Sequence, residues 1–331
     1  MTRSAIANDR IVPIGVYPTP VERIEKLGLW VKRDDLTNPD YGGNKVRKLE
    51  RLLFEARRRG KRRIVTVGAA GSHHVLATAL FGARAGFEVD AVLTPQRSTP
   101  HVTENLRADL GLGARLATAR TYPGAALGML ARSGRDAYLV PVGGSNGVGA
   151  LGYVDAAFEL ADQIEAGELP EPDAVVVTVG SGGTAAGLAA GFALAGIRAT
   201  VVGVLVSAPA FLVAFWTRRL ARHVFRQRAR GAGALVRADP SSRLELTARY
   251  LGAGYGEPTD AGRHAMSVAA DVGLSLDLTY TAKCFAAALD CVHSARFSNV
   301  LYWHTLSSAP LAPLLEKAPV DVPPKLAKLL R

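Results

Sequence analysis

The sequence predicts an α/β protein whose mostly parallel sheets carry helices on both faces. Short runs rich in β-branched residues alternate with longer helical patterns along the chain. The strand-like runs are residues 64–67, 89–93, 137–141, 175–179, 201–206 and 300–303. The helical patterns between them are residues 45–59, 74–85, 103–110, 149–163 and 184–195. Strands separated by helices pair in parallel, and such sheets bind ligands beyond the carboxyl ends of their strands.

Length and composition limit the class of protein. At 331 residues the chain exceeds what one hydrophobic core usually serves, so one large or two modest lobes are expected. Its 48% hydrophobic and 21% charged residues exclude global disorder. Two uncharged stretches, residues 174–197 and 199–217, are long enough to cross a bilayer. Because the first has a Gly-rich break and the second meets Pro209, we expect strands, turns and helices there rather than membrane spans.

The formal net charge of +11 is only partly concentrated, in two basic stretches, residues 47–63 and 218–230. Both fit helical spacing, so we expect them to be solvated helix faces. Neither is accompanied by a zinc-finger spacing or an aromatic stacking motif, and no nucleic-acid partner is expected. A nucleic-acid surface along residues 218–230 stays open as an alternative.

The two cysteines, Cys284 and Cys291, lie seven residues apart in a helical pattern. At a rise of about 1.5 Å per residue they are about 10 Å apart, whereas a disulfide needs Cα atoms within about 7 Å. The first residues show no apolar stretch before a small-residue cleavage site. We therefore expect a reduced protein in the cytoplasm.

Three predicted strands run into loops rich in glycine and hydroxyl side chains, at residues 68–74, 142–147 and 180–184. The last reads Gly-Ser-Gly-Gly-Thr and predicts a phosphate cradle, because glycines let backbone N–H groups approach an anion at a helix start. It also fits a loose dinucleotide pattern, but residues 198–207 contain no acid for a ribose hydroxyl. A phosphate cofactor without ribose is favoured over NAD.

Lys45 is the candidate nucleophile of the sequence. It follows Gly-Gly-Asn at residues 42–44 and begins a helical pattern in a chain with few lysines. A helix start disfavours a positive charge, so this amine loses its proton more readily, as a Schiff-base nucleophile requires. A solvated lysine after a turn is the alternative for this local feature.

The stretch that contains Lys45 resembles the signature of a known family. Residues 31–36 (Val-Lys-Arg-Asp-Asp-Leu) and 42–50 (Gly-Gly-Asn-Lys-Val-Arg-Lys-Leu-Glu) resemble the signature of the D-cysteine desulfhydrase and 1-aminocyclopropane-1-carboxylate (ACC) deaminase family. These are pyridoxal 5'-phosphate (PLP) enzymes of fold type II, the tryptophan synthase β fold. Further similar stretches follow in the same order, at residues 71–74, 141–145, 149–153, 180–184, 254–258 and 280–283. The resemblance spans about residues 18–304.

The resemblance implies a two-lobed enzyme and a homodimer. Residues 1–47 and 154–331 would form a large PLP-binding domain, and residues 48–153 a smaller inserted α/β domain. Lys45 would hold PLP as a Schiff base and move the α-proton of the substrate. The other implied cofactor-binding residues are Asn44, His73, Gly180, Ser181, Gly182, Gly183, Thr184 and Thr281, with the loop at the phosphate and Thr281 at the pyridine nitrogen.

The implied substrate contacts point to β-elimination. Ser72 would bind the substrate carboxylate, and Tyr255 and Tyr280 would lie near the ring and the leaving group. A neutral hydroxyl such as Thr281 at the pyridine nitrogen makes a weaker electron sink than an acid, which suffices when a good leaving group departs. With D-cysteine the products would be pyruvate, hydrogen sulfide and ammonia. ACC deamination, β-replacement on another amino acid, a catalytically lapsed binding protein and an NAD oxidoreductase stay open.

Several positions depart from the family pattern. His73 stands where the family usually has the Asn that contacts the ring oxygen, and Leu306-Ser307 replaces a Gly-Gly pair. These changes leave the amino-acid substrate and its handedness open. Lys283 is a second candidate for the Schiff base, but no glycines flank it. His73 and His74 are adjacent and diverge on a helix, so no metal site is expected.

Overall fold

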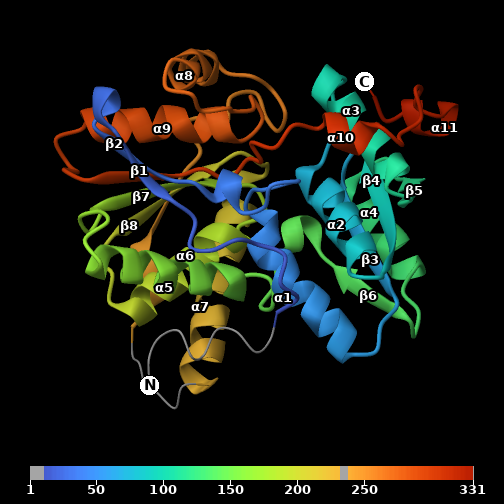
Figure 1. Cartoon of the computed structure of the whole chain (residues 1–331), viewed down its shortest axis with the longest axis horizontal. Coiled ribbons are helices and arrows are strands. Elements are labelled where there is room, and N and C mark those ends of the chain that lie inside the picture. Colours follow the sequence, from blue (N-terminus) through green and yellow to red (C-terminus); the bar gives the residue numbers. More distant parts are fainter. Residues whose placement is uncertain (1–10, 232–237, 331) are drawn as a thin grey trace. The chain divides into compact units, whose positions relative to one another are not determined.

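The computed structural model describes residues 11–231 and 238–330, and it divides into two compact units. The first unit contains residues 15–48 and 145–308. The second contains residues 49–144 together with residues 11–14 and 309–330. Figure 1 follows the chain by colour through both units. The sheets are mostly parallel and carry helices, so the predicted fold class is confirmed.

The first unit is built on a six-stranded sheet in the order β1-β2-β10-β7-β8-β9. Only β1 pairs antiparallel, with β2, and the other pairs are parallel. The strands are β1 (Val21–Ile24), β2 (Leu29–Lys32), β7 (Ala174–Val179), β8 (Thr200–Leu205), β9 (Leu244–Thr247) and β10 (Val300–Trp303). The central strand β7 is buried throughout, as the continuous β-branched run predicts for a sheet covered on both faces.

Helices cover both faces of this sheet (Figure 1). One face carries α5 (Leu151–Glu165), α6 (Gly183–Ala195) and α7 (Ala210–Gly231). The other carries α8 (Asp260–Ala270) and α9 (Thr281–His293). Alternate residues of β7 enter the two cores, since Val175 and Val177 pack with α5 and α6 whereas Val176 packs with α9. Helix α1 (Lys45–Arg58) begins in the first unit and continues into the second.

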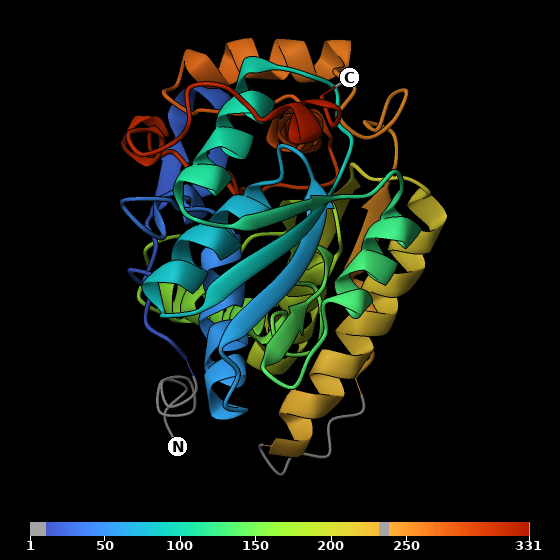
Figure 2. The ribbon, with the colours of Figure 1, turned by 90° about the vertical axis from the view of Figure 1, so that its right-hand side faces the viewer.

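The second unit has a parallel four-stranded sheet in the order β5-β4-β3-β6 (Figure 2). Its strands are β3 (Arg63–Ala69), β4 (Glu88–Thr94), β5 (Arg115–Thr118) and β6 (Ala137–Val140). Its helices are α2 (His73–Arg84), α3 (Pro100–Gly111), α4 (Tyr122–Ala131) and the short α10 (Ala312–Leu315) and α11 (Pro324–Ala327). Leu93 of β4 packs with α2 and α3, and its neighbour Val92 packs with α4, so helices lie on both faces.

The basic stretch at residues 47–63 is only partly the solvated face that its composition predicts, because Arg57, Arg58, Arg59 and Arg62 are exposed but the basic residues at its start are not. Arg47, Lys48 and Arg51 are only 3, 2 and 6% exposed on α1, so the expectation was wrong for them. The first two have acidic or hydroxyl partners far away in the sequence, described below, and composition alone does not reveal such partners. The second stretch behaves as expected, because Arg219, Arg222 and three further basic residues of α7 are exposed, namely His223, Arg226 and Arg230.

The long apolar stretches form the expected elements. Residues 174–197 form β7, a loop and α6, and residues 199–217 form β8 and the start of α7. No helix in the described part of the chain is long and apolar enough to cross a membrane. Cys284 is buried and Cys291 is half-buried on α9, and neither forms a disulfide.

Candidate active site

Lys45 is the first residue of α1, and the chain reaches it through a tight glycine turn. Gly43 has φ +90°, and a Cβ there would lie 2.7 Å from the carbonyl oxygen of Thr305. A Cβ on Gly42 would overlap the backbone of Asp35. The backbone N–H of Gly42 donates to Ser307 Oγ at 2.9 Å. Only glycine allows this close approach of two backbones, which fixes where α1 begins.

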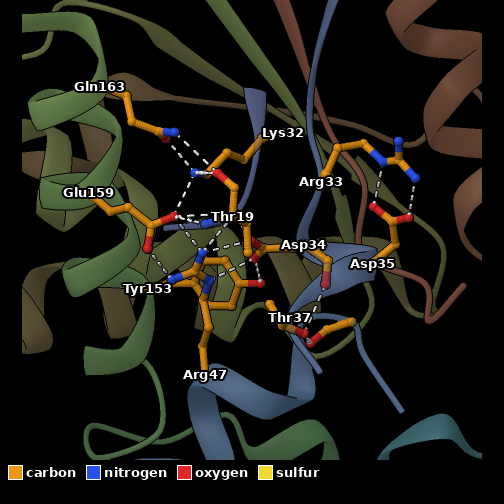
Figure 3. Close-up of polar contacts among 11 residues, drawn as sticks. Thr19, Lys32, Arg33, Asp34, Asp35, Thr37, Arg47, Tyr153, Glu159 and Gln163 are labelled. Atoms are coloured by element: carbon orange, nitrogen blue, oxygen red, sulfur yellow. Dashed lines mark hydrogen bonds and ion pairs between the residues drawn. The ribbon is translucent and has the colours of Figure 1, made fainter. Parts of the chain in front are cut away.

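A buried polar network fixes the start of α1 through the side chain of Arg47 (Figure 3). The guanidinium of Arg47 donates to both carboxylate oxygens of Asp34, at 2.9 and 2.7 Å. It also donates to both oxygens of Glu159, at 2.9 Å each. Lys32 donates to Glu159 at 2.6 Å, so two cations and two anions balance one another. Thr19, Tyr153 and Gln163 complete the network.

Asp34 ties the network to the turn that precedes Lys45. Its carbonyl oxygen accepts from the N–H of Gly43 at 2.9 Å, while its carboxylate binds Arg47. Lys45 lies between these two anchored positions. Fork-shaped pairs of this kind fix direction as well as distance, so the network orients the first turn of α1.

The environment of Lys45 makes its amine easier to deprotonate. Its Nζ donates to Oδ1 of Asn44 at 2.6 Å. The amide of Asn44 in turn donates to the hydroxyl of Thr184 at 3.0 Å, which links Lys45 to the glycine loop. Burial lowers the pKa of Lys45 to about 8, although the carboxylate of Asp277 opposes this shift. An amine with this pKa is partly deprotonated at neutral pH, as a nucleophile must be.

The loop at residues 180–184 connects β7 to α6, as the sequence predicts. Gly182 has φ +86°, and a Cβ there would overlap the side chain of Thr217. A Cβ on Gly183 would overlap the hydroxyl of Ser145 and lie 3.0 Å from Nζ of Lys48. The loop therefore brings backbone, hydroxyl groups and an ammonium together at the N-terminus of α6, an arrangement suited to an anion.

Two residues of this cradle, Lys48 and Ser145, were not among the predicted site residues, although Ser145 lies in the predicted loop at residues 142–147. Ser145 Oγ accepts from the N–H of Gly183 at 3.0 Å and is 2.8 Å from Ser181 Oγ. Lys48 donates to Ser145 Oγ at 3.4 Å. Burial and the nearby charge of Lys45 hold the pKa of Lys48 well below its ordinary value. Its spacing was a usable signal, since Lys48 lies three residues after Lys45 and so on the same side of α1.

Tyr255 and Tyr280 are brought together, although they lie far apart in the sequence. Their hydroxyl groups share a short hydrogen bond, and their rings meet edge to face with centroids 5.8 Å apart. Tyr280 also lies near the glycine loop, because a Cβ on Gly180 would be 3.7 Å from its ring. The phenol pair is therefore next to the loop that carries the anion cradle.

Thr281 is buried beside a carboxylate that the sequence reasoning did not use. Its hydroxyl donates to Oδ1 of Asp277 at 2.6 Å and accepts from the backbone N–H of Asp277 at 2.8 Å. The same carboxylate accepts from the backbone N–H groups of Thr279 and Tyr280, at 3.0 and 2.9 Å. It also accepts from the backbone N–H of Thr281, the first residue of α9, at 3.0 Å, so Asp277 fixes the start of that helix.

Ser72 and His73 belong to the second unit. Ser72 is the N-cap of α2, where its hydroxyl accepts from the N–H of Val75 at 3.4 Å. Nε2 of His73 lies 3.0 Å from Nε2 of His101, a hydrogen bond that the sequence did not predict. Among the described residues, no three His, Cys, Asp or Glu side chains form a group able to hold a metal ion.

Two proteins with the same name are similar to this chain in sequence. The chain is 35% identical to a protein named D-cysteine desulfhydrase from Salmonella schwarzengrund (strain CVM19633) over 308 residues, 87% of this chain and 91% of the relative. It is equally identical, 35% over 313 residues, to a protein of the same name from Salmonella newport (strain SL254), with the same coverage of both chains.

Solved structures show the same fold. One described as an ACC deaminase homologue is 28% identical, has a TM-score of 0.78 and covers 94% of this chain and 98% of its own. Threonine deaminase isoform 2 from Solanum lycopersicum is 18% identical with a TM-score of 0.60, covering 91% of this chain and 88% of its own, a likeness of fold alone.

Most of the chain also matches a family model. The model described as "Pyridoxal-phosphate dependent enzyme" matches residues 12–305, which include the Lys45 turn, the glycine loop and the phenol pair. The resemblance seen in the sequence is thereby confirmed. The chain belongs to the family of pyridoxal-phosphate-dependent enzymes.

Proposed function

We propose that this PLP-dependent enzyme is a lyase that removes the β-substituent of a small amino acid, with D-cysteine as the substrate to test first. The observation that carries the proposal is the half-buried Lys45, whose pKa is lowered to about 8 beside the glycine loop. The relatives named D-cysteine desulfhydrase support the choice of substrate. NAD oxidation is not favoured, because the family uses PLP.

The residues present fit PLP. Lys45 offers an amine for its aldehyde, and Asn44 fixes the direction of that amine. The phosphate would be held by the backbone and hydroxyl groups of Gly180, Ser181, Gly182, Gly183 and Thr184, with Ser145 and the ammonium of Lys48. This donor set of amides, hydroxyls and one buried lysine suits a phosphate dianion, whose charge would favour the protonated form of the lysine amine. When bound, PLP supplies an electron sink for the negative charge left at Cα.

The chain's own groups would then move protons. Lys45 takes the proton from Cα, for which a neutral amine is needed. The paired hydroxyls of Tyr255 and Tyr280 line the side of the leaving group, and one phenol donates its proton to the departing thiolate. Loss of that group leaves an enamine, which hydrolyses to pyruvate and ammonia.

The remaining contacts are proposed from the resemblance. Ser72 would bind the substrate carboxylate, and His73 would take the place of the Asn at the ring oxygen. Thr281 would face the pyridine nitrogen. Because Thr281 gives its only hydroxyl proton to Asp277, it would act there as an acceptor.

We also propose that residues 48–153 act as a small domain inserted into a large PLP-binding domain formed by residues 1–47 and 154–331. We propose further that the enzyme is a cytoplasmic homodimer whose partner is a small amino acid and not nucleic acid. Light scattering after size-exclusion chromatography would test the dimer, with one monomer mass as the contradicting result.

The decisive experiment is spectroscopic and enzymatic. The purified protein is expected to be yellow, with a chromophore that borohydride reduces onto the chain. A panel of D- and L-amino acids, with ACC included, is then screened for keto acid, ammonia and sulfide. Release of pyruvate and sulfide from D-cysteine supports the proposal. A yellow protein that acts only on ACC, or only on another amino acid, would contradict the substrate while leaving the cofactor in place.

The pH dependence of cofactor capture follows from the pKa of Lys45. A lowered pKa means that the reactive neutral amine is present above about pH 8 and is lost as the pH falls below it, to about a tenth at pH 7. The rate at which the apoprotein takes up PLP in borohydride-stable form should therefore rise through pH 8. Asp277→Asn should move the inflection lower, because its charge favours the protonated amine. An inflection near pH 10.5 would mean that the amine is fully solvated.

Lys48 should contribute to affinity for PLP rather than to chemistry. Lys48→Met removes a charge-assisted hydrogen bond worth about 1.5–3 kcal/mol, so PLP should bind about 10- to 100-fold more weakly to the apoprotein. Fluorescence titration measures this constant. The exposed Lys26, replaced by Met, is the matched control and should bind PLP as the wild type does. Equal affinity in the Lys48 and Lys26 variants would remove Lys48 from the phosphate site.

A further inference from the structure

Lys283 is a buried lysine for which the proposed reaction has no role. It lies in the first turn of α9 and is fully shielded from solvent. Its Nζ donates to the carbonyl oxygens of Leu251 and Gly254, at 2.8 and 3.3 Å. Burial lowers its pKa, while Glu257 and Asp277 oppose the shift. A lysine is rarely buried without a structural or functional reason.

The two carbonyl groups belong to the segment that carries Tyr255. This segment has little stiffness of its own, because Gly252, Gly254 and Gly256 all have positive φ values, of 67°, 150° and 79°. A Cβ on either Gly254 or Gly256 would meet nothing within 4 Å. Tertiary contacts must therefore set the position of Tyr255.

Tyr280 is the partner of Tyr255 in the phenol pair. It immediately precedes α9, three residues before Lys283. The first turn of α9 thus touches the segment twice, once through the ammonium of Lys283 and once through the hydrogen bond between the two phenols. The carboxylate of Asp277 accepts from the backbone N–H groups of Tyr280 and Thr281, so the backbone of the turn that carries Lys283 is fixed.

We propose that Lys283 is a positioning residue that holds the segment of residues 251–256 against α9 and so sets the distance and angle between the hydroxyl groups of Tyr255 and Tyr280. The proposal rests on the proposed function, in which these phenols serve the leaving group. It also removes Lys283 as a second candidate for the Schiff base, since its ammonium is committed to two backbone carbonyls.

A double-mutant cycle tests whether Lys283 acts through Tyr255. Lys283→Met keeps the apolar stem and removes the donors, and it should lower kcat for D-cysteine about tenfold with KM changed less than twofold. In the Tyr255→Phe background the same substitution should lower kcat by less than a further twofold. Lys283→Arg, which restores donors, should recover part of kcat. Full additivity of the two losses would overturn the proposal, because a general effect on folding acts in both backgrounds.

A second readout needs no turnover. Protein labelled with 3-fluorotyrosine should give separate ¹⁹F signals for Tyr255 and Tyr280, assigned with the two Phe variants. Lys283→Met should shift both signals and change the pH at which they titrate, while uptake of PLP stays as in the wild type. Unchanged signals, or loss of the borohydride-stable cofactor, would contradict a positioning role. If the wild type does not act on D-cysteine, the proposed function fails, but the ¹⁹F result still decides the role of Lys283.

Discussion

Lys45→Ala is expected to abolish both the covalent attachment of PLP and turnover. The variant loses the amine that attaches the cofactor and that moves the Cα proton, so the rate should fall by about a thousandfold or more. Folding should be preserved, because Lys45 is only half-buried and the ion pairs that fix α1 involve other residues. Mass spectrometry after borohydride reduction measures the attachment, and pyruvate release measures the turnover.

The control for this experiment is Lys26→Ala, which changes an exposed lysine of the same unit. It should keep the chromophore and full activity. Retention of covalent cofactor in Lys45→Ala would show that another lysine carries it, and Lys48, which lies beside the glycine loop, would then be the first to examine.

Glu159→Gln is expected to cause the largest loss of stability. The carboxylate of Glu159 accepts from both Arg47 and Lys32, and the substitution leaves a net buried positive charge. Removing one partner of a buried ion pair costs about 3–5 kcal/mol. The free energy of unfolding should fall by about this amount in urea titrations. The borohydride-stable uptake of PLP should also slow, because Arg47 no longer orients the turn that begins at Lys45.

A surface ion pair gives the comparison. Arg198 pairs with Glu171 while its own side chain is 86% exposed, so Arg198→Gln should change the free energy of unfolding by less than about 1 kcal/mol. An equally small change for Glu159→Gln would show that the network contributes little to stability.

At acid pH, the free energies of unfolding of Glu159→Gln and of the wild type should lie closer together. Burial alone would raise the pKa of Glu159, but Arg47 and Lys32 outweigh it and lower the pKa to about 2, from an ordinary 4.5. The contribution of the ionised carboxylate is therefore complete above pH 4.5 and is lost as the pH falls through about 2. Urea titrations at pH 7 and pH 3 would measure the change.

The parts of the fold that sequence predicted best are those with a strong local pattern. The runs that became β7 and β8 are β-branched and apolar, and such runs form buried central strands. The strands it left out, β1, β2, β5 and β9, are all short. Strands β1 and β9 have only four residues each and lie at the edges of the sheet, where alternation is brief and one side is solvated.

The candidate site divides in the same way. Lys45 and the loop at residues 180–184 stand out because glycines beside a lysine or a helix start have a local chemical meaning. Lys48 and the role of Ser145 do not stand out, because each acts on a residue that another part of the chain supplies. The arginine-rich start of α1 was misjudged for the same reason, since Asp34 and Glu159 are far from it in sequence.

The sequence by itself determined the alternation of strands and helices, the glycine turns and the lysine that begins α1. These depend on backbone freedom and on side-chain spacing within a few residues. Only the tertiary structure decided which charges are buried, which phenols meet and what lowers the pKa of Lys45. Desolvation and hydrogen bonding depend on neighbours that folding brings from distant segments, and a linear sequence does not contain those distances.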